Sequence, residues 1–466
     1  MRNFPCKTAF ALAVSMLVCG CGTTNKLKFE HFTEEYKQGE FCKATDTVLD
    51  EKNVCNTDIE KFKPADFNID EQLNAGTSLF LAQKHELSES LFEKASSSIQ
   101  EDLSSTGIAR GTVEVVANAS MLDYNPMIMD GIYLHSYTFL NALSAENKDD
   151  AKIQINRAYN FQQNAVNAFS KEIEKEKADA GKEASQMEKD AKAANNKNIS
   201  DVMANYKQFA KWKGYSNFVN PYVTYISGLY FMTNGTGNSD YENASNYMKR
   251  VHGMVSSNTF VKDDLAIAEK LAQGNRSALK PTAWVVFENG LVARFKEFRL
   301  DLPIFIATDN VKTASLALPY PEQRDEAFKN IAVSNGKKKV TTETLADIDN
   351  IFIAEFHKKL PTIVAKAVTK LALQTAAQAV AQDQFGDLGG IAAATYSVMT
   401  AGADTRSWYS LPKNVQLAKV AKNGDKITLY IGDKNIDVNV PENGNSIVYV
   451  RTPSASSNPV VEVFNL

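Results

Sequence analysis

The sequence predicts an α+β fold, with a helical domain ahead of a domain of antiparallel β-strands that has helices inserted between its strands. Three features support this class. Apolar residues recur every three or four positions from Phe62 to about Gly274, and past Pro281 they form short continuous runs. From Val415 to the end, β-branched runs alternate with Asn- or Gly-marked turns. The 466-residue chain is long enough for two or three hydrophobic cores.

Residues 1–20 have the features of a secretory signal, because Arg2 and Lys7 precede a short apolar stretch. The tetrad Val18-Cys19-Gly20-Cys21 resembles a bacterial lipobox, in which the last cysteine is acylated and becomes the new N-terminus. We expect Cys21 to carry acyl chains such as palmitate, which hold a protein at a membrane. The alternative is an ordinary signal peptide cut nearby, with Cys21 a plain thiol.

Residues 21–61 form the next segment, which contains Cys42 and Cys55. With Cys6 and Cys19 in the signal and Cys21 at the anchor, these two make an even pair in an exported chain, which is typical of a disulfide. The alternative is a redox-active or metal-binding pair, although the spacing is far from Cys-x-x-Cys and no His lies between them.

Residues 62–280 contain three imperfect helix pairs. They begin near Leu73, Tyr133 and Tyr222, and their small and large residues have the spacing of tetratricopeptide helix pairs. We expect small side chains where paired helices cross closely, at Gly76, Ala95, Ala151, Ala158, Gly228 and Ala244. The alternative is an irregular helical domain without true repeats.

A stretch rich in Ala, Lys and Glu lies between the second and third pairs, near 171–197. Mixed charges at helical spacing favour a long solvated helix supported by i,i+4 ion pairs. The stretch is either a solvated extension of one helix pair or an arm that binds a partner.

Residues 281–466 are predicted to form an α/β domain with strands at both ends and helices near 344–400. We expect the strands before and after these helices to complete one antiparallel sheet or sandwich. The expected strands cover 283–291, 298–304, 314–318, 415–420, 426–431, 436–440, 446–451 and 460–464.

No standard catalytic signature occurs in the chain, and its five His residues are scattered without ligand spacing. We therefore expect no cofactor and no metal. The net charge of −4 argues against a nucleic-acid partner, because phosphate binding requires a dominant basic surface.

Two local clusters remain as candidates for a binding site or a structural junction. Glu288 and Asn289 stand at the end of a predicted strand. Asp404, Arg406 and Trp408 place an acid, a guanidinium and an indole within one short stretch. Arg and Trp together offer a fork of donors and an apolar face for a carboxylate or a sugar. The alternative is that these residues fix the junction between the helices and the final strands.

Several segments in order along the chain carry a family resemblance. They are Asn220-Pro221-Tyr222, Tyr225 to Leu229, Phe287 to Gly290, Leu302-Pro303, Ala317 to Pro319, Ala403 to Trp408 and Leu411-Pro412. In this order they resemble an uncharacterised family of bacterial envelope lipoproteins with a tetratricopeptide-like N-terminal half and a mixed α/β C-terminal half. The resemblance implies no reaction and no catalytic residues. Genes of that family often neighbour those for activators of peptidoglycan synthases, which implies partners in the cell-wall synthesis machinery.

Together these observations predict a lipid-anchored, non-enzymatic scaffold that binds envelope proteins. Gly22 and Thr23 follow Cys21 without the acidic residue that favours retention in the inner membrane, so we expect an outer-membrane anchor and a body that faces the periplasm. One alternative is a hydrolase or transferase that acts on cell-wall material through the Asp404, Arg406 and Trp408 region. Another is a surface or secretion-associated lipoprotein.

Overall fold

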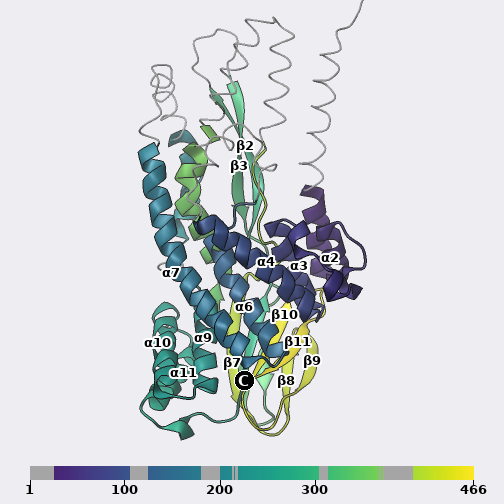
Figure 1. Ribbon diagram of the computed structural model, residues 1–466, viewed down its shortest axis with the longest axis vertical. Coiled ribbons are helices and arrows are strands. Elements are labelled where there is room, and N and C mark those ends of the chain that lie inside the picture. Colours follow the sequence, from purple (N-terminus) through teal and green to yellow (C-terminus); the bar gives the residue numbers. More distant parts are fainter. Residues whose placement is uncertain are drawn as a thin grey trace, which may run out of the picture.

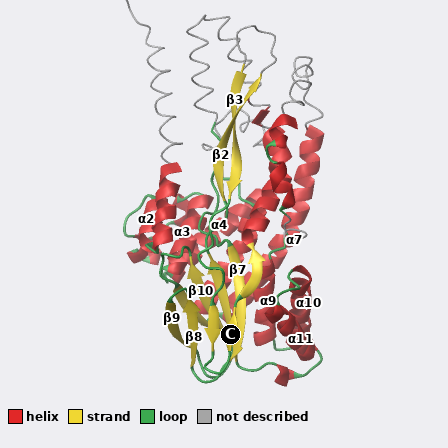
Figure 2. Ribbon diagram, turned by 180° about the vertical axis from the view of Figure 1, so that it is seen from behind, coloured by secondary structure: helices red, strands yellow, loops and turns green. Residues whose placement is uncertain are grey.

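Helices and strands lie in two layers. The computed structural model describes residues 26–104, 124–179, 200–212, 215, 219–303, 313–365, 367, 368, 371 and 402–466. In Figure 1 most helices lie in front of the strands, and the view from behind in Figure 2 brings the strands forward. The mixture of helix and sheet confirms the predicted α+β class.

The N-terminal part is helical and packs against the C-terminal half. A helix over 26–38 leads into α2 (Phe41–Leu49) and the short turns η1 (Val54–Asn56), η2 (Ile59–Lys61) and η3 (Pro64–Asp66). The Tyr36 hydroxyl donates to the carbonyl of Ser410 at 3.1 Å, and the Ser454 hydroxyl donates to the carbonyl of Lys37 at 2.8 Å. The described part of segment 21–61 therefore belongs to the main body.

The main helical layer consists of paired helices, followed by α11. Each pair is joined by a short connection, and its two helices pack side by side. The pairs are α3 (Ile69–Leu81) with α4 (His85–Ser104), α6 (Ile128–Ser144) with α7 (Lys148–Asp179), and α9 (Pro221–Asn234) with α10 (Asn238–Met254). Short turns η5 (Lys207–Lys211) and η7 (Arg276–Ala278) flank the third pair and α11 (Thr259–Ala272). The charged stretch near 171–197 begins as the end of α7, and residues 180–199 lie outside the described part.

Glycines stand where the paired helices cross. A Cβ added at Gly76 would lie 2.8 Å from the Phe92 ring, and one at Gly228 would lie 2.9 Å from the Tyr247 side chain. Both positions were predicted as close crossings. Gly131 was not, yet a Cβ there would meet the Phe161 ring at 2.0 Å. The four alanines predicted at crossings, Ala95, Ala151, Ala158 and Ala244, are all buried.

Five strands form the main sheet, in the order β11-β10-β1-β7-β6. Their bounds are β1 (Thr282–Asn289), β6 (Glu343–Asp347), β7 (Asn414–Ala421), β10 (Ser446–Thr452) and β11 (Val460–Asn465). Strands from before and after the inserted helix join in this sheet, as predicted. The expectation of a purely antiparallel arrangement is wrong, because β1 pairs with β10 in parallel. A long connection separates these two strands, so no tight turn forces them to run in opposite directions.

The remaining strands form two smaller sheets. Among the described residues, β2 (Arg294–Pro303) and β3 (Thr313–Glu322) pair with each other alone, as an antiparallel ribbon that extends away from the body in Figure 1. The second sheet has the order β5-β4-β8-β9 and contains β4 (Ala332–Ser334), β5 (Lys339–Thr341), β8 (Lys426–Ile431) and β9 (Lys434–Asn439). The very short strands β4 and β5 were missed in the sequence, since three residues are too few for a strand pattern.

The inserted helix begins later than predicted. We expected helix from Thr344, but β6 continues to Asp347 as an edge strand paired with β7. Asp347 then accepts a hydrogen bond from the amide of Asn350 at 2.9 Å, which caps the helix that begins at residue 348. Of the helices predicted near 344–400, residues 372–401 lie outside the described part.

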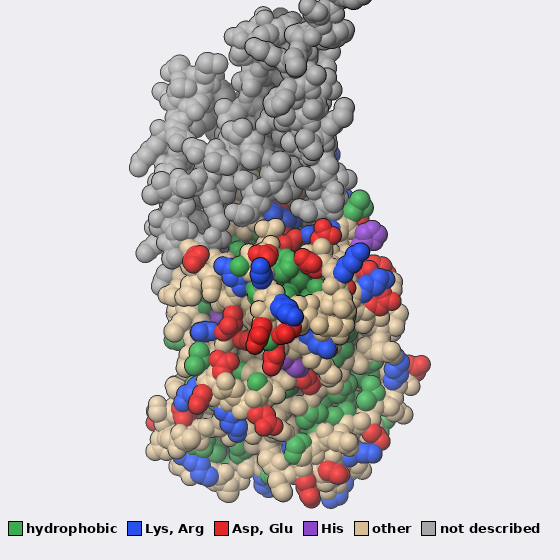
Figure 3. Space-filling view, turned by 45° about the vertical axis from the view of Figure 1, so that its right-hand side comes forward, with side chains coloured by type: hydrophobic (Ala, Val, Ile, Leu, Met, Phe, Trp, Pro, Cys, Tyr) green, Lys and Arg blue, Asp and Glu red, His purple; other side chains and the backbone are tan. Residues whose placement is uncertain are grey.

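One continuous hydrophobic core joins the two regions that the sequence divides at Pro281. It includes helix residues such as Tyr137 and Leu229 and strand residues such as Trp284 and Val448. On the face shown in Figure 3, acidic and basic side chains are interspersed among the described residues, in line with the small net charge of −4.

Candidate functional site

Glu288 lies at the interface between the helices and the main sheet. It is near the end of β1, and it is 0% exposed. Tyr133 and Tyr137 on α6 donate their hydroxyls to its two carboxylate oxygens at 2.7 and 2.9 Å, and Tyr449 on β10 donates at 2.7 Å. Burial, reinforced by the Glu288 charge, holds the pKa of all three tyrosines well above the usual value. They therefore remain neutral donors.

Arg451 provides the charge that balances Glu288. It projects from β10, is 0% exposed, and has its Nε 3.8 Å from a Glu288 carboxylate oxygen. Its Nη1 donates to the carbonyls of Glu288 and Gly290 at 3.2 and 2.6 Å, and its Nη2 donates to the carbonyl of Ser410 at 3.0 Å. A buried ion pair with such additional hydrogen bonds is costly to break from one side only.

Asn289 is the adjacent candidate, and its side chain fixes a loop. Its Nδ2 donates to the carbonyl of Phe328 at 2.7 Å, and its Oδ1 accepts from the amides of Ala327 and Phe328, both at 3.1 Å. Gly290 follows with a φ of +63°, a left-handed conformation that favours glycine. The amide side chain is thus occupied by backbone partners.

Asp404 and Arg406 form a bidentate pair with each other. Arg406 donates from Nε and Nη2 to the two Asp404 carboxylate oxygens at 2.9 and 2.8 Å. Asp70 on α3 lies close to this pair, and burial raises the pKa of Asp70 to about 6, an effect that the Arg406 charge opposes. The pair therefore sits where the final strands meet the first helix pair.

Trp408 lies inside the core. It is 1% exposed, and its Nε1 donates to the Thr77 hydroxyl on α3 at 2.9 Å. Its ring lies 5.8, 6.1 and 5.9 Å from those of Phe92, Tyr133 and Tyr137. The indole is therefore covered on the helix side. Since Tyr133 also bonds Glu288, the structure brings Trp408 and Glu288 into one cluster, with Asp404 and Arg406 at its edge.

Further buried carboxylates escaped the sequence analysis, among them Asp264 and Glu355. Asp264 on α11 accepts from the Tyr225 hydroxyl at 2.5 Å, from Trp284 Nε1 at 3.0 Å and from Lys419 Nζ at 2.6 Å. It stands on the helix face that also carries Val261, Ala268 and Leu271, so an acid at an apolar position was the available signal.

The second is Glu355 in the inserted helix. Its carboxylate accepts from the amides of Ile128 and Met129 at 2.6 and 3.1 Å, and so caps the N-terminus of α6 from a distant part of the chain. Lys359 lies 3.1 Å away as its ion-pair partner. An acid within the apolar run Ile351 to Phe356 was the signal.

The polar clusters around Glu288, Asp264 and Glu355 connect side chains and backbone groups from different helices and strands, and so hold the helix layer against the sheet. Within the described residues there is no grouping of three or more His, Cys, Asp or Glu side chains able to hold a metal ion. In the same part of the chain, no helix combines the length and the apolar character needed to cross a bilayer.

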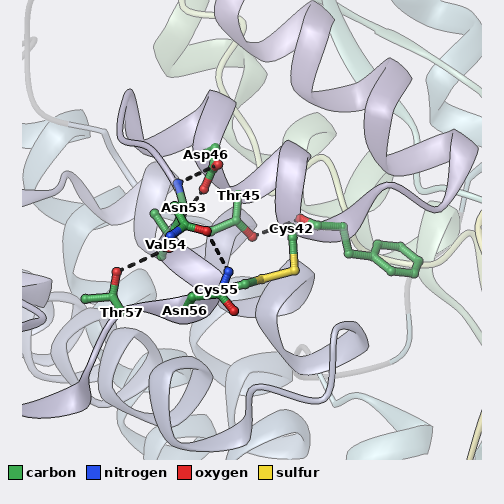
Figure 4. Close-up of a disulfide and its surroundings, with 9 residues drawn as sticks. Cys42, Thr45, Asp46, Asn53, Val54, Cys55, Asn56 and Thr57 are labelled. Carbon is green, nitrogen blue, oxygen red and sulfur yellow. Dashed lines mark hydrogen bonds between the residues drawn. A yellow bond between two sulfur atoms is a disulfide. The ribbon is translucent and has the colours of Figure 1, made fainter.

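Cys42 and Cys55 are joined by a disulfide, as the sequence predicts. The S–S distance is 2.01 Å, and the Cα atoms are 5.7 Å apart (Figure 4). Asp46 supports the same loop, since its carboxylate accepts from the amides of Asn53 and Val54 at 2.8 and 2.9 Å. Closing a loop over a sequence separation of 13 stabilises the fold by about 3 kcal/mol in the chain-entropy model.

The predicted lipidation site, Cys21, lies outside the described residues. Compared with protein-family models, curated proteins and solved structures, the chain gives no match.

Proposed function

We propose that this chain is a lipid-anchored protein of the bacterial cell envelope that acts as a non-enzymatic scaffold for protein partners. The observation that carries the proposal is that the buried Glu288 carboxylate is fully occupied in joining the helices to the sheet. Its carboxylate is bonded by Tyr133 and Tyr137 from the helices and by Tyr449 from the sheet. The Glu288 carboxylate and its tyrosine partners thus join the helix layer to the sheet. This use favours a rigid body whose outer surfaces bind other proteins.

The helix pairs are proposed to be tetratricopeptide-like repeats. Support comes from three successive pairs that each have a glycine at the crossing, at Gly76, Gly131 and Gly228. Repeats of this kind bury their apolar faces only by stacking, and their exposed faces commonly bind peptides or proteins.

The anchor is proposed to be Cys21, which gives the molecule an orientation. The helix over 26–38 ends next to α2 in the body, so residue 26 lies at the end of this helix that is farther from α2. Cys21 precedes residue 26 by five residues, which span at most about 17 Å. This helix and the β2–β3 ribbon point toward the same end of the molecule in Figure 1. On this proposal the ribbon faces the membrane. A Cys21→Ser variant should be recovered in the soluble fraction without acyl label, and its retention in washed membranes would refute the anchor.

The partner class follows from that orientation. A protein bound to the ribbon lies between the body and the bilayer, or is itself embedded in the bilayer. We therefore propose envelope proteins associated with the membrane, among which the cell-wall synthesis machinery is the class implied by the family resemblance.

Site-specific photocrosslinking in living cells tests the scaffold. A photoreactive residue replaces Arg299 on β2, whose side chain is 52% exposed. We expect one or a few crosslinked proteins, identified by mass spectrometry as integral or lipid-anchored envelope proteins.

Asn423 is the matched control. It is exposed in the turn after β7, at the end of the main sheet opposite to where β1 leads toward the ribbon. Crosslinking that is equal at Arg299 and Asn423, or that yields only abundant soluble proteins, contradicts the proposal.

A further inference from the structure

A polar cavity opens between α4, α6 and α7, away from the Glu288 cluster. Its volume is about 360 Å³. Most of its lining is polar and combines carboxylate, hydroxyl, amide, imidazole and guanidinium groups, from Glu93, Ser97, Gln100, His135, Arg157 and Asn160. Other polar contacts between these helices, such as Asn141 Nδ2 to the Ser88 hydroxyl and the Thr138 hydroxyl to Gln154, are closed by hydrogen bonds of 3.1 Å, whereas the polar lining of this cavity faces an open volume.

His135 is the most buried polar residue of the cavity lining. It belongs to α6, whose residues from Ile128 to Leu143 are all buried, and it is 4% exposed. Its Nδ1 is buried without a hydrogen-bond partner. Burial lowers the pKa of His135 to about 4, so the ring is neutral at physiological pH. A neutral imidazole offers one donor and one acceptor, and a buried ring nitrogen without a partner costs free energy that a ligand can recover.

The cavity mouth has groups of both charges. Glu93 on α4 and Arg157 on α7 approach to 3.9 Å, with side chains 57% and 51% exposed. Such a loose, solvated ion pair contributes little to stability, so either side chain can turn from the other to a ligand hydroxyl.

Glu89 lies one turn before Glu93 on α4. Burial raises the pKa of Glu89 to about 8, so this carboxyl is largely protonated near neutral pH.

The chemistry of the lining narrows the ligand class. An anion would have a single guanidinium, already facing Glu93, and an apolar molecule would leave the polar groups unsatisfied. A neutral molecule with many hydroxyls matches a set of donors and acceptors that includes amides, a carboxylate and a neutral imidazole. The Phe161 ring, 6.2 Å from that of His135, adds an apolar wall.

We propose that this cavity is a carbohydrate-binding site for one or two neutral sugar rings, with His135 as the polar group at its base. Its volume is at the lower end of the range for small-molecule sites, which suits a mono- or disaccharide. The site is independent of the scaffold proposal, because no residue of the Glu288 cluster lines it.

Saturation-transfer NMR on the full chain tests the site, with glucose, N-acetylglucosamine and diacetylchitobiose as probes. We expect millimolar or tighter binding of at least one probe. In an Asn160→Trp variant the bulky ring fills the mouth, and binding should fall at least tenfold. The control is Asn243→Trp, which places the same side chain on an exposed position of α10 and should bind like the wild type.

A His135→Leu variant separates a ligand role from a packing role. Leucine keeps an apolar volume but removes both ring nitrogens, so binding should fall at least tenfold while the melting temperature stays the same or rises. The proposal is overturned if none of the three sugars binds, if Asn160→Trp binds as well as Asn243→Trp, or if a stable His135→Leu protein binds normally.

Discussion

At the level of single residues, the greatest demand on this fold is the burial of Glu288 and Arg451 side by side. Both are 0% exposed, and both rely on partners from elements distant in sequence. Removing one charge leaves the other uncompensated in an apolar environment, which is far more costly than losing the pair as a whole.

A double-mutant cycle tests this account. Arg451→Met should lower the free energy of unfolding by about 3–5 kcal/mol, because Glu288 then remains charged without its cation. Adding Glu288→Gln should recover part of that loss, since the amide carries no charge. Urea unfolding of the four proteins measures the coupling. Strictly additive effects would show that the two side chains do not depend on each other.

The sequence indicated some of these residues but not their partners. Glu288 and Trp408 were recognisable as polar or amphipathic groups at element ends. Tyr137 and Tyr449, which bond Glu288, stand 151 and 161 residues away from it. Only the three-dimensional arrangement of α6 and β10 against β1 brings them together, and no local pattern carries that information.

At the level of elements, the helix pairs were predictable because their pattern is local. The spacing of Gly76 and Gly228 relative to the next helix follows from helix geometry and short connections. Strand direction was not predictable in the same way. The parallel pairing of β1 with β10 depends on how a long intervening chain folds, and the edge strand β6 was concealed by the helix that directly follows it.

The crossing of α9 and α10 gives the second stability prediction. A Cβ at Gly228 would lie 2.9 Å from Tyr247, so Gly228→Leu must shift a helix or force neighbours off their rotamers, costing about 1–3 kcal/mol. Thermal unfolding measures the effect. Gly253→Leu is the control. Gly253 belongs to α10 of the same helix pair, but a Cβ there would meet nothing within 4 Å. Equal melting temperatures for wild type and Gly228→Leu would contradict the close crossing.

At the scale of the whole molecule, the sequence suggested a boundary at Pro281, whereas packing connects both sides of it. The change from helix to strand does occur there. However, Trp408 from the C-terminal region lies among Phe92, Tyr133 and Tyr137 from the helices. A change of periodicity locates a change of secondary structure, but it does not reveal whether the two parts share a core.

A shared core predicts that the helices and the sheet unfold together. Far-UV circular dichroism follows mainly the helices. Tryptophan fluorescence reports the buried indoles of Trp284 and Trp408, which lie in the core between sheet and helices, together with the half-buried Trp212. The two probes should give coincident thermal transitions, because neither layer keeps its apolar surface covered once the other is lost. Arg451→Met should move both transitions to lower temperature by the same amount, since its contacts span the sheet and the segment around Ser410. Loss of helical signal well before the fluorescence change would instead indicate two regions that fold separately, and the link through Glu288 would then be too weak to make the body rigid.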